Sequence, residues 1–226
     1  MNINGHVIKE SNSVKLLGVT IDYQIKMDDH INKLCKEAGK KVNALARVSY
    51  FMEENKRILL MKTFITSYFN YCPLVWMFCS RKGNNRINRI HERAMRIAYR
   101  DYQSTFEELL IKSKTVNSHT KNLQYLATEI YKTINGLNPT FMNEIFSINT
   151  SPYNLRHSQF KNIEPNYKIY GFNTVSYRCN QIWNSHPVEI KNSPSLDSFK
   201  NRIKTFNSFK CTCDICKQYI HNVGFM

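Results

Sequence analysis

Apolar side chains recur at steps of three and four residues through much of this chain, and this helical period constrains the possible folds most strongly. Between 28 and 52 the recurring residues would share one face of a helix; they are Ile31, Leu34, Ala38, Val42, Leu45 and Met52. Similar patterns predict helices over 54–71, 85–100, 119–134 and 195–206. The sequence therefore predicts a mainly α fold.

Residues with known preferences for helix ends set the expected boundaries. Pro73 would end or kink the second helix because proline lacks the N–H that a helix interior needs. Gly136 would close the fourth helix, and Ser195 would cap the start of the last one. Ser104 and Glu107 have capping-box spacing, which predicts a further short helix beginning there.

Three other segments depart from the helical period. Residues 2–9 and 14–21 favour strands, and 10–13 would join them into a short N-terminal β-hairpin. Residues 147–180 are polar, with few periodic apolar positions, and predict a long irregular segment. The apolar run at 74–79 is far shorter than the roughly 20 residues that a membrane-spanning helix needs. No membrane partner is therefore expected.

The chain is strongly basic. Its 32 Lys and Arg residues against 17 Asp and Glu give a formal net charge of +15 over 226 residues. Such an excess favours a polyanionic partner, with nucleic acid ahead of an anionic membrane surface. The alternative interpretation is a basic protein without any polyanionic partner.

The segment 84–100 concentrates this charge. As a helix it would place five arginines, termed the arginine stripe, within an arc of roughly 80°; they are Arg86, Arg89, Arg93, Arg96 and Arg100. Like charges at this spacing repel one another, and only Glu92 and Asp101 lie nearby in the sequence. Guanidinium groups contact phosphate in a bidentate manner, so the stripe is predicted to bind nucleic-acid phosphates. A solvated helix face is the alternative.

The seven cysteines fall into two groups. Four are scattered among apolar or helical residues and are predicted to be small core residues; they are Cys35, Cys72, Cys79 and Cys179. The other three fall in "CTCDICKQYIH" (211–221), which ends in a histidine. Since the sequence begins with no secretory signal, thiols or metal ligands are favoured over disulfides.

This second group predicts a candidate zinc site. Cys213, Cys216 and His221 have the spacing of the first three ligands of a zinc knuckle, but the fourth position is Met226, a poor zinc ligand. Cys211 could supply the fourth ligand instead, and a Cys3His set suits tetrahedral zinc. The alternative is a tail with three reduced thiols.

Several motifs, taken in order, carry a family resemblance. They are "KLLGVTID" (15–22), "DDHINKL" (28–34), "FITSYFNYCPLVW" (64–76), "INRIHERAMRI" (87–97), "NLQYLATEIYKTINGLNP" (122–139) and "QIWNSHPVEIKNSPSLDSFKNRIK" (181–204). With the Cys-rich ending they resemble the C-terminal part of the reverse transcriptase of a jockey-like non-LTR retrotransposon. The parts implied are a palm-end hairpin remnant at 1–22, a helical thumb and C-terminal helical region at 28–146, an irregular segment at 147–180, a C-terminal helical segment at 181–210 and a Cys-rich tail at 211–226.

The departures from this family bear on activity. A polymerase needs carboxylates that hold divalent cations, and by resemblance its catalytic palm strands would precede Met1. In "KMDD" (26–29), Lys26 replaces the aromatic residue of the family's aspartate pair, and a helix start explains both Asp28 and Asp29. Three histidines without a nucleophile motif are expected to be surface or packing residues rather than catalysts; they are His91, His119 and His157.

These observations predict a non-catalytic, nucleic-acid-binding remnant of an RNA-directed DNA polymerase. Its partner would be RNA or DNA, contacted through phosphates, and its candidate cofactor is one structural zinc ion. The resemblance implies a nuclear or cytoplasmic location. A helical structural or interaction module with no nucleic-acid role is the alternative.

Overall fold

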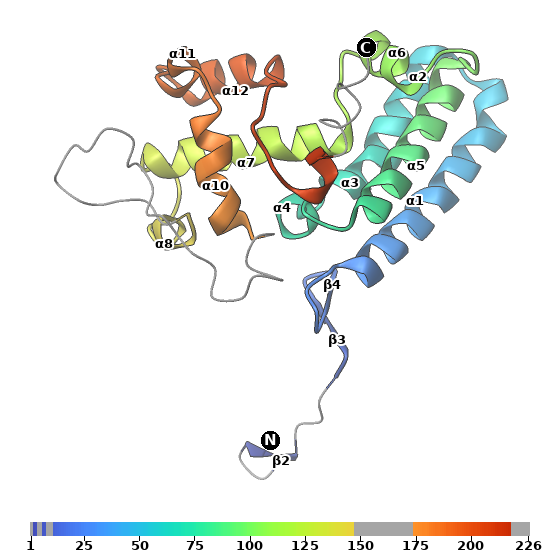
Figure 1. Ribbon diagram of the computed structural model, residues 1–226. Coiled ribbons are helices and arrows are strands. Elements are labelled where there is room, and N and C mark those ends of the chain that lie inside the picture. Colours follow the sequence, from blue (N-terminus) through green and yellow to red (C-terminus); the bar gives the residue numbers. More distant parts are fainter. Residues whose placement is uncertain (1, 4–5, 8–10, 147–173, 218–226) are drawn as a thin grey trace. The chain divides into compact units, whose positions relative to one another are not determined.

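Figure 1 shows the chain as a computed structural model. The residues that it describes are 2–3, 6–7, 11–146 and 174–217. The chain divides into two compact units: unit 1 comprises Met1–Cys72 and Cys79–Leu109, and unit 2 comprises Pro73–Phe78 and Leu110–Met226. The fold is mainly α with an N-terminal antiparallel hairpin, so the predicted fold class is confirmed.

Two antiparallel hairpins begin unit 1. Their strands are β1 (Asn2–Ile3), β2 (His6–Val7), β3 (Ser13–Leu16) and β4 (Val19–Asp22). β1 pairs with β2 and β3 pairs with β4, so the predicted pairing of 2–9 with 14–21 is wrong. The reason is a two-residue turn at Leu17 and Gly18, where φ angles of 46° and 85° match the primed turns that close tight hairpins.

The helices of unit 1 follow the predicted apolar period. They are α1 (Asp28–Val48), the 3-10 turn η1 (Ser49–Phe51), α2 (Glu54–Leu60), the π-helical η2 (Met61–Thr66), α3 (Ser67–Asn70), α5 (Arg81–Tyr99) and the first part of α6 (Phe106–Lys112). The predicted helix over 54–71 is thus helical to Asn70, with a π-helical middle. Pro73 begins the next helix.

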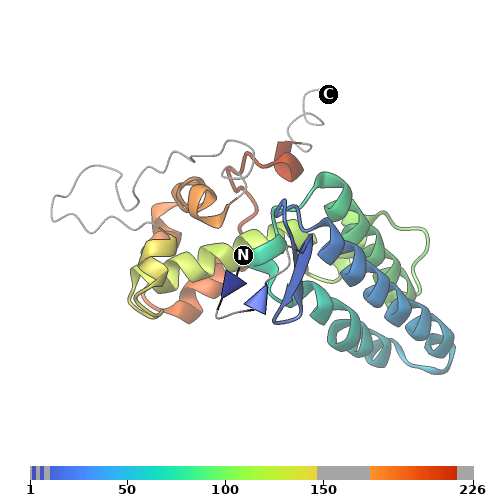
Figure 2. The ribbon, with the colours of Figure 1, turned by 90° about the horizontal axis from the view of Figure 1, so that it is seen from below.

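The long helices α1 and α5 lie side by side in both Figure 1 and Figure 2 and form the core of unit 1. Ile31, Ala38 and Val42 on α1 are at most 1% exposed, as are Ile87 and Ala94 on α5. A fully buried aliphatic side chain contributes about 1.5–3 kcal/mol. The α1–α5 seam is therefore held by many such side chains along two continuous helix faces.

Polar contacts hold the two ends of α5 against neighbouring helices. α5 begins at Arg81, earlier than predicted, because Ser80 caps it by accepting a hydrogen bond from a backbone N–H at 3.2 Å. The Ser80 hydroxyl also donates to Asp28 at 3.0 Å, and α1 begins at Asp28 as predicted. The buried Arg57 of α2 donates from Nε to a carbonyl of α5 at 2.9 Å.

Unit 2 is arranged around α7. Its helices are α4 (Pro73–Trp76), α7 (Ser118–Ile134), α8 (Met142–Ile145), α10 (Val175–Asn184), α11 (Val188–Lys191) and α12 (Leu196–Lys204). α7 packs against α4, α8, α10 and α12. Tyr131 of α7 stacks on Phe199 with ring centroids 4.3 Å apart, and Trp183 stacks on Phe199 at 6.1 Å. The Tyr131 hydroxyl donates to the Ser193 carbonyl at 2.7 Å, which fixes the chain before α12.

Several predicted boundaries shift by small amounts. α10 begins at Val175, within the segment predicted to be irregular, whereas 147–173 lie outside the described residues. The capping box of α6 is formed by Thr105 and Glu108, one position after the predicted pair. Ser104 instead bonds to Asp101, which holds the preceding turn. Ser195 caps α12 as predicted.

Candidate metal centre and candidate nucleic-acid interface

Three cysteines near the end of unit 2 lie against the first turn of α7. Cys211 and Cys213 are each 2% exposed, and Cys216 is partly buried. A short helical turn begins after Cys213, whose carbonyl accepts from the N–H of Lys217 at 3.0 Å. This turn directs Cys213 and Cys216 to the same side as Cys211.

A histidine from a distant part of the sequence completes this group. Asn117 caps α7, so that His119 is the second residue of the helix, and the His119 side chain is buried. Its Nε2 lies 3.3 Å from Cys213 Sγ. The ligand atoms of His119, Cys211, Cys213 and Cys216 all lie within 4.8 Å of one another. This buried cluster could hold a metal ion such as zinc.

The thiols of the cluster interact strongly. Hydrogen bonds from the Cys211 and Cys216 thiols lower the pKa of Cys213, while the hydrogen bond with Cys213 raises the pKa of Cys211 to about 11. His119 Nε2 adds a further hydrogen bond to Cys213. Because metals bind thiolates and release their protons, an ion in this cluster would replace the protons that the thiols share.

The predicted and observed ligand sets share three cysteines. His221 lies outside the described residues, as does His157. His119 was expected to be a surface or packing residue, and the structure instead brings it to the thiols from 94 positions away. No local spacing motif links His119 to the cysteines. The available signals were a histidine in the first turn of a predicted helix and a cysteine group lacking a clear fourth ligand.

The arginine stripe occupies α5 as predicted, and most of it is exposed. Arg86, Arg89, Arg93 and Arg100 are exposed, whereas Arg96 is partly buried and forms an ion pair with Glu92 at 2.7 Å. The arginines therefore have different environments, although their spacing in the sequence is regular.

Three stripe residues also bind the segment formed by α1 and η1. Arg86 donates to Asn32, and Arg93 donates to Asn43 at 2.8 Å. Arg100 donates to the carbonyls of Ser49 and Tyr50, each at 3.0 Å. In contrast, Arg89 forms no hydrogen bond or ion pair within the part of the chain that the structure describes. Part of the stripe thus helps to fasten α5 to its neighbour, a role that the sequence did not indicate.

A basic hollow lies at the N-terminal half of α5. Its volume is about 610 Å³, and its lining residues are Arg81, Lys82, Asn85, Arg86 and Arg89. The lining holds four cationic side chains and no carboxylate. Arg81 and Lys82 are not part of the predicted stripe, because the helix was expected to begin only at residue 85.

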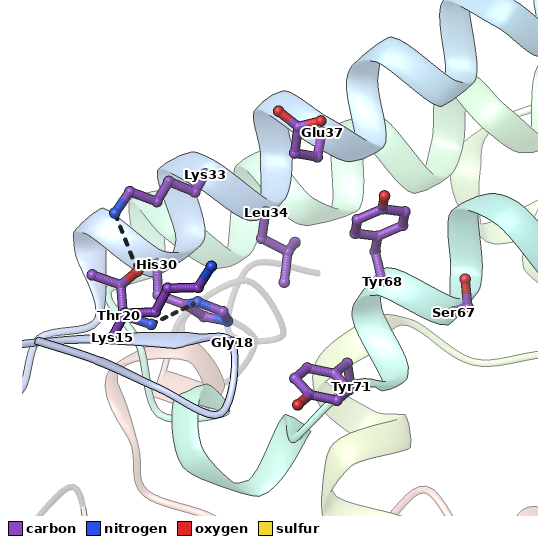
Figure 3. Close-up of a pocket in the computed structure, with 10 residues that line it drawn as sticks. All are labelled: Lys15, Gly18, Thr20, His30, Lys33, Leu34, Glu37, Ser67, Tyr68 and Tyr71. Atoms are coloured by element: carbon purple, nitrogen blue, oxygen red, sulfur yellow. Dashed lines mark hydrogen bonds between the residues drawn. The ribbon is translucent and has the colours of Figure 1, made fainter.

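A pocket of about 590 Å³ lies elsewhere in unit 1, among the β3–β4 hairpin, α1 and α3 (Figure 3). Figure 3 shows Lys15, His30 and Lys33 on one side, with the rings of Tyr68 and Tyr71 on the other. The only carboxylate in the lining is that of Glu37, and the remaining lining residues are Gly18, Thr20, Leu34 and Ser67. The pocket therefore combines aromatic surface with two ammonium groups.

Hydrogen bonds fix the walls of this pocket. Lys33 donates to the Thr20 hydroxyl at 3.2 Å, and the Thr20 N–H donates to His30 Nδ1 at 3.4 Å. Burial, together with the charge of Lys33, lowers the pKa of His30, which favours the neutral ring that accepts this bond. The Tyr71 hydroxyl donates to the Leu17 carbonyl in the hairpin turn.

Three of the scattered cysteines are buried as predicted, namely Cys35, Cys79 and Cys179, while Cys72 is partly exposed. His91 is 8% exposed and packs against Phe69 and Phe106. Asp28 and Asp29 are exposed at the start of α1.

The chain matches no protein-family model, no curated protein and no solved structure. Among the helices that the structure describes, none has both the length and the apolar character needed to cross a bilayer.

Proposed function

We propose that this chain is a non-catalytic, nucleic-acid-binding remnant of a reverse transcriptase from a jockey-like non-LTR retrotransposon. The basic hollow on α5 carries the binding part of the proposal, because four cations line it without a carboxylate. The descent rests on the ordered sequence motifs. No polymerase activity is assigned. A nucleic-acid partner and reduced cysteine thiols are both typical of proteins of the nucleus or cytoplasm.

The chemistry of the hollow suits phosphate. Arg89 has no partner among the described side chains and backbone groups, so all five of its N–H donors are available. Arg86 uses one terminal nitrogen for Asn32 and keeps other donors. Adjacent guanidinium groups can bridge successive phosphates, and release of condensed counterions supplies much of the binding free energy.

The pocket in Figure 3 supports the same proposal from another part of unit 1. Tyr68 and Tyr71 offer rings on which a base of a single strand can stack, while Lys15 and Lys33 offer charge for its phosphate. Stacking of this kind tolerates any base, so the proposal includes no sequence preference.

The decisive experiment compares the salt dependence of binding for two triple variants. In the first, Arg81, Lys82 and Arg89 are each replaced by Gln. In the matched control the three exposed cations replaced by Gln lie in unit 2; they are Lys200, Lys204 and Lys210. The net charge of the two variants is the same. Duplex DNA, duplex RNA and single strands serve as probes.

The hollow variant should bind more weakly, and its slope of log K against log salt should decrease in magnitude by about 2–3 units on duplex DNA. The control should keep a slope close to that of the parent chain. Equal slopes in the parent and the hollow variant would contradict the proposal, as would a parent chain whose affinity does not depend on salt.

The second candidate function is a structural or interaction module. One observation favours it: Arg86, Arg93 and Arg100 are bound to α1 and η1, as expected for charges that stabilise a helix pair. A self-associating chain that binds no nucleic acid at low salt would support this candidate against the first.

We also propose that the Cys-rich segment of unit 2 holds one structural zinc ion. Soft thiolate ligands and an imidazole suit tetrahedral zinc, and four protein ligands leave no open position for a reacting water. Zinc would therefore stabilise the fold and take no part in chemistry.

A further inference from the structure

We infer that the zinc ligands are His119 Nε2 and the thiolates of Cys211, Cys213 and Cys216, and that the ion clamps the C-terminal segment to the first turn of α7. This inference rests on the structural zinc proposed above and assigns its ligands and its mechanical role. It does not depend on nucleic-acid binding.

The geometry of the four side chains is close to that of a zinc tetrahedron. Zinc lies about 2.3 Å from sulfur and about 2.0–2.1 Å from nitrogen, so neighbouring ligand atoms are about 3.5–3.8 Å apart. In the cluster, Cys213 Sγ and His119 Nε2 are 3.3 Å apart, and no two ligand atoms are more than 4.8 Å apart. Small side-chain rotations would close the cluster around an ion.

The surroundings favour an ion with thiolate ligands. Three thiolates and Zn²⁺ carry one net negative charge, which complements the positive end of α7 where His119 lies. The ring of Phe78 meets the His119 ring edge-on, with centroids 6.3 Å apart, and this contact limits the movement of the imidazole. His119, Cys211 and Cys213 are each at most 3% exposed, so few waters compete for the ion.

Contacts independent of the metal already hold the segment in place. Gln124 of α7 donates to the Lys204 carbonyl at 3.2 Å. Arg178 of α10 donates to the Thr212 hydroxyl at 2.6 Å, between the first two cysteines. The thiols are therefore held near His119 before an ion arrives, which lowers the entropic cost of binding.

The cluster also has a route to solvent. A pocket of about 220 Å³ is lined by His119, Cys211 and Cys216 together with Phe209 and polar residues of the α7 start. An ion can enter through this pocket, and a chelator can remove it. The ligand side chains are thus largely buried, while one side of the site is open to solvent.

The test measures zinc content and zinc affinity of the full chain, purified under reducing conditions without chelator. His119→Ala and Cys213→Ala remove proposed ligands, and His119→Cys replaces the imidazole by another zinc ligand. His221→Ala removes the histidine suggested by the knuckle spacing. His186→Ala and Cys179→Ala remove a buried histidine and a buried cysteine of unit 2 that lie outside the cluster.

We expect one zinc per chain in the parent, His221→Ala, His186→Ala, Cys179→Ala and His119→Cys. His119→Ala and Cys213→Ala should bind zinc at least about 100-fold more weakly, since even partners of zinc ligands are worth 10–100-fold. Cobalt substitution gives a second measurement, because its thiolate charge-transfer band should weaken in Cys213→Ala and persist in His119→Cys. Circular dichroism verifies that each variant is folded.

Other outcomes overturn the inference at different points. A parent chain without zinc, or with a disulfide among the three cysteines, would overturn the zinc site itself. Zinc that is retained at full affinity in His119→Ala, or lost in His221→Ala, would overturn the ligand assignment and leave a structural zinc in the tail. Visible absorption typical of an iron–sulfur cluster would show that the cysteines hold a different cofactor in place of zinc.

Discussion

The α1–α5 seam of unit 1 and the joint between α7 and the C-terminal segment of unit 2 hold their parts together in different ways. The seam spreads its stabilisation over many buried aliphatic side chains along two long helices. The joint concentrates four potential ligands within 4.8 Å. A distributed interface should weaken by degrees when one residue is changed, whereas a four-ligand site should fail as a whole when one ligand or its ion is removed.

Metal removal should separate the two regions most clearly. A chelator should cost unit 2 roughly 4 kcal/mol of unfolding free energy if zinc is present at about a thousand times its dissociation constant. Hydrogen exchange should accelerate at 211–217 and in the first turn of α7, because these are the parts that the ion would join. Amides of α1 and α5 should keep their protection. Equal acceleration in both units, or in neither, would contradict this contrast.

A smaller and graded loss is expected from the seam. Ile87 is fully buried on α5, so Ile87→Ala should lower the free energy of unfolding by about 3 kcal/mol through lost burial and a residual cavity. Denaturant unfolding would measure the change, and zinc content should not fall. The control is Leu59→Ala on α2, where the side chain is 59% exposed and the expected loss is below about 0.5 kcal/mol.

Acid should affect unit 2 through His186, with the smallest of the three effects. Burial lowers the pKa of His186 from 6.5 to about 4. Because the unfolded chain then binds the proton more readily than the folded chain, stability is fully present above pH 6.5 and falls as the pH drops toward 4. The expected loss is roughly 2 kcal/mol at pH 5.

His186→Phe provides the comparison for this pH effect. His186 packs against both Phe206 and Phe209, and a phenyl ring would keep much of that contact without titrating. Acid also displaces zinc. Denaturant unfolding of both chains would therefore be measured without zinc, at several pH values between 7 and 5. A parent curve as flat as that of the variant would contradict the role given to His186.

The two regions also differ in how far their sequence predicts them. The seam follows from residues three or four positions apart, so the apolar period predicted both long helices and most of the buried residues of α1. Capping determined the remaining differences: Ser80 starts α5 before the predicted position, and Thr105 with Glu108 takes the place of Ser104 with Glu107. These are shifts within a correct pattern.

The joint depends on residues that are far apart in the sequence. The cysteines were found because they are close together, but His119 lies 94 positions before Cys213 and shares no motif with it. The fold of unit 2 brings them together through α7, α10 and α12, and no local pattern specifies that arrangement. The pairing of the N-terminal strands was mispredicted because the turn at Leu17 requires a positive φ, which an aliphatic residue does not indicate.

The π-helical segment η2 has a consequence for deletions near the pocket of Figure 3. Its hydrogen bonds reach one residue further than those of an α-helix, so its turn holds about one residue more. Met61 and Ile65 are buried in this segment, and Tyr68 of α3 and Tyr71, just after α3, form the pocket wall that follows. Loss of one residue from 61–66 would convert the wide turn into an ordinary α turn and leave the following residues facing nearly the same way. Both tyrosines would then still face Lys15 and Lys33, whereas the same loss from a regular α-helix would rotate them by about 100°.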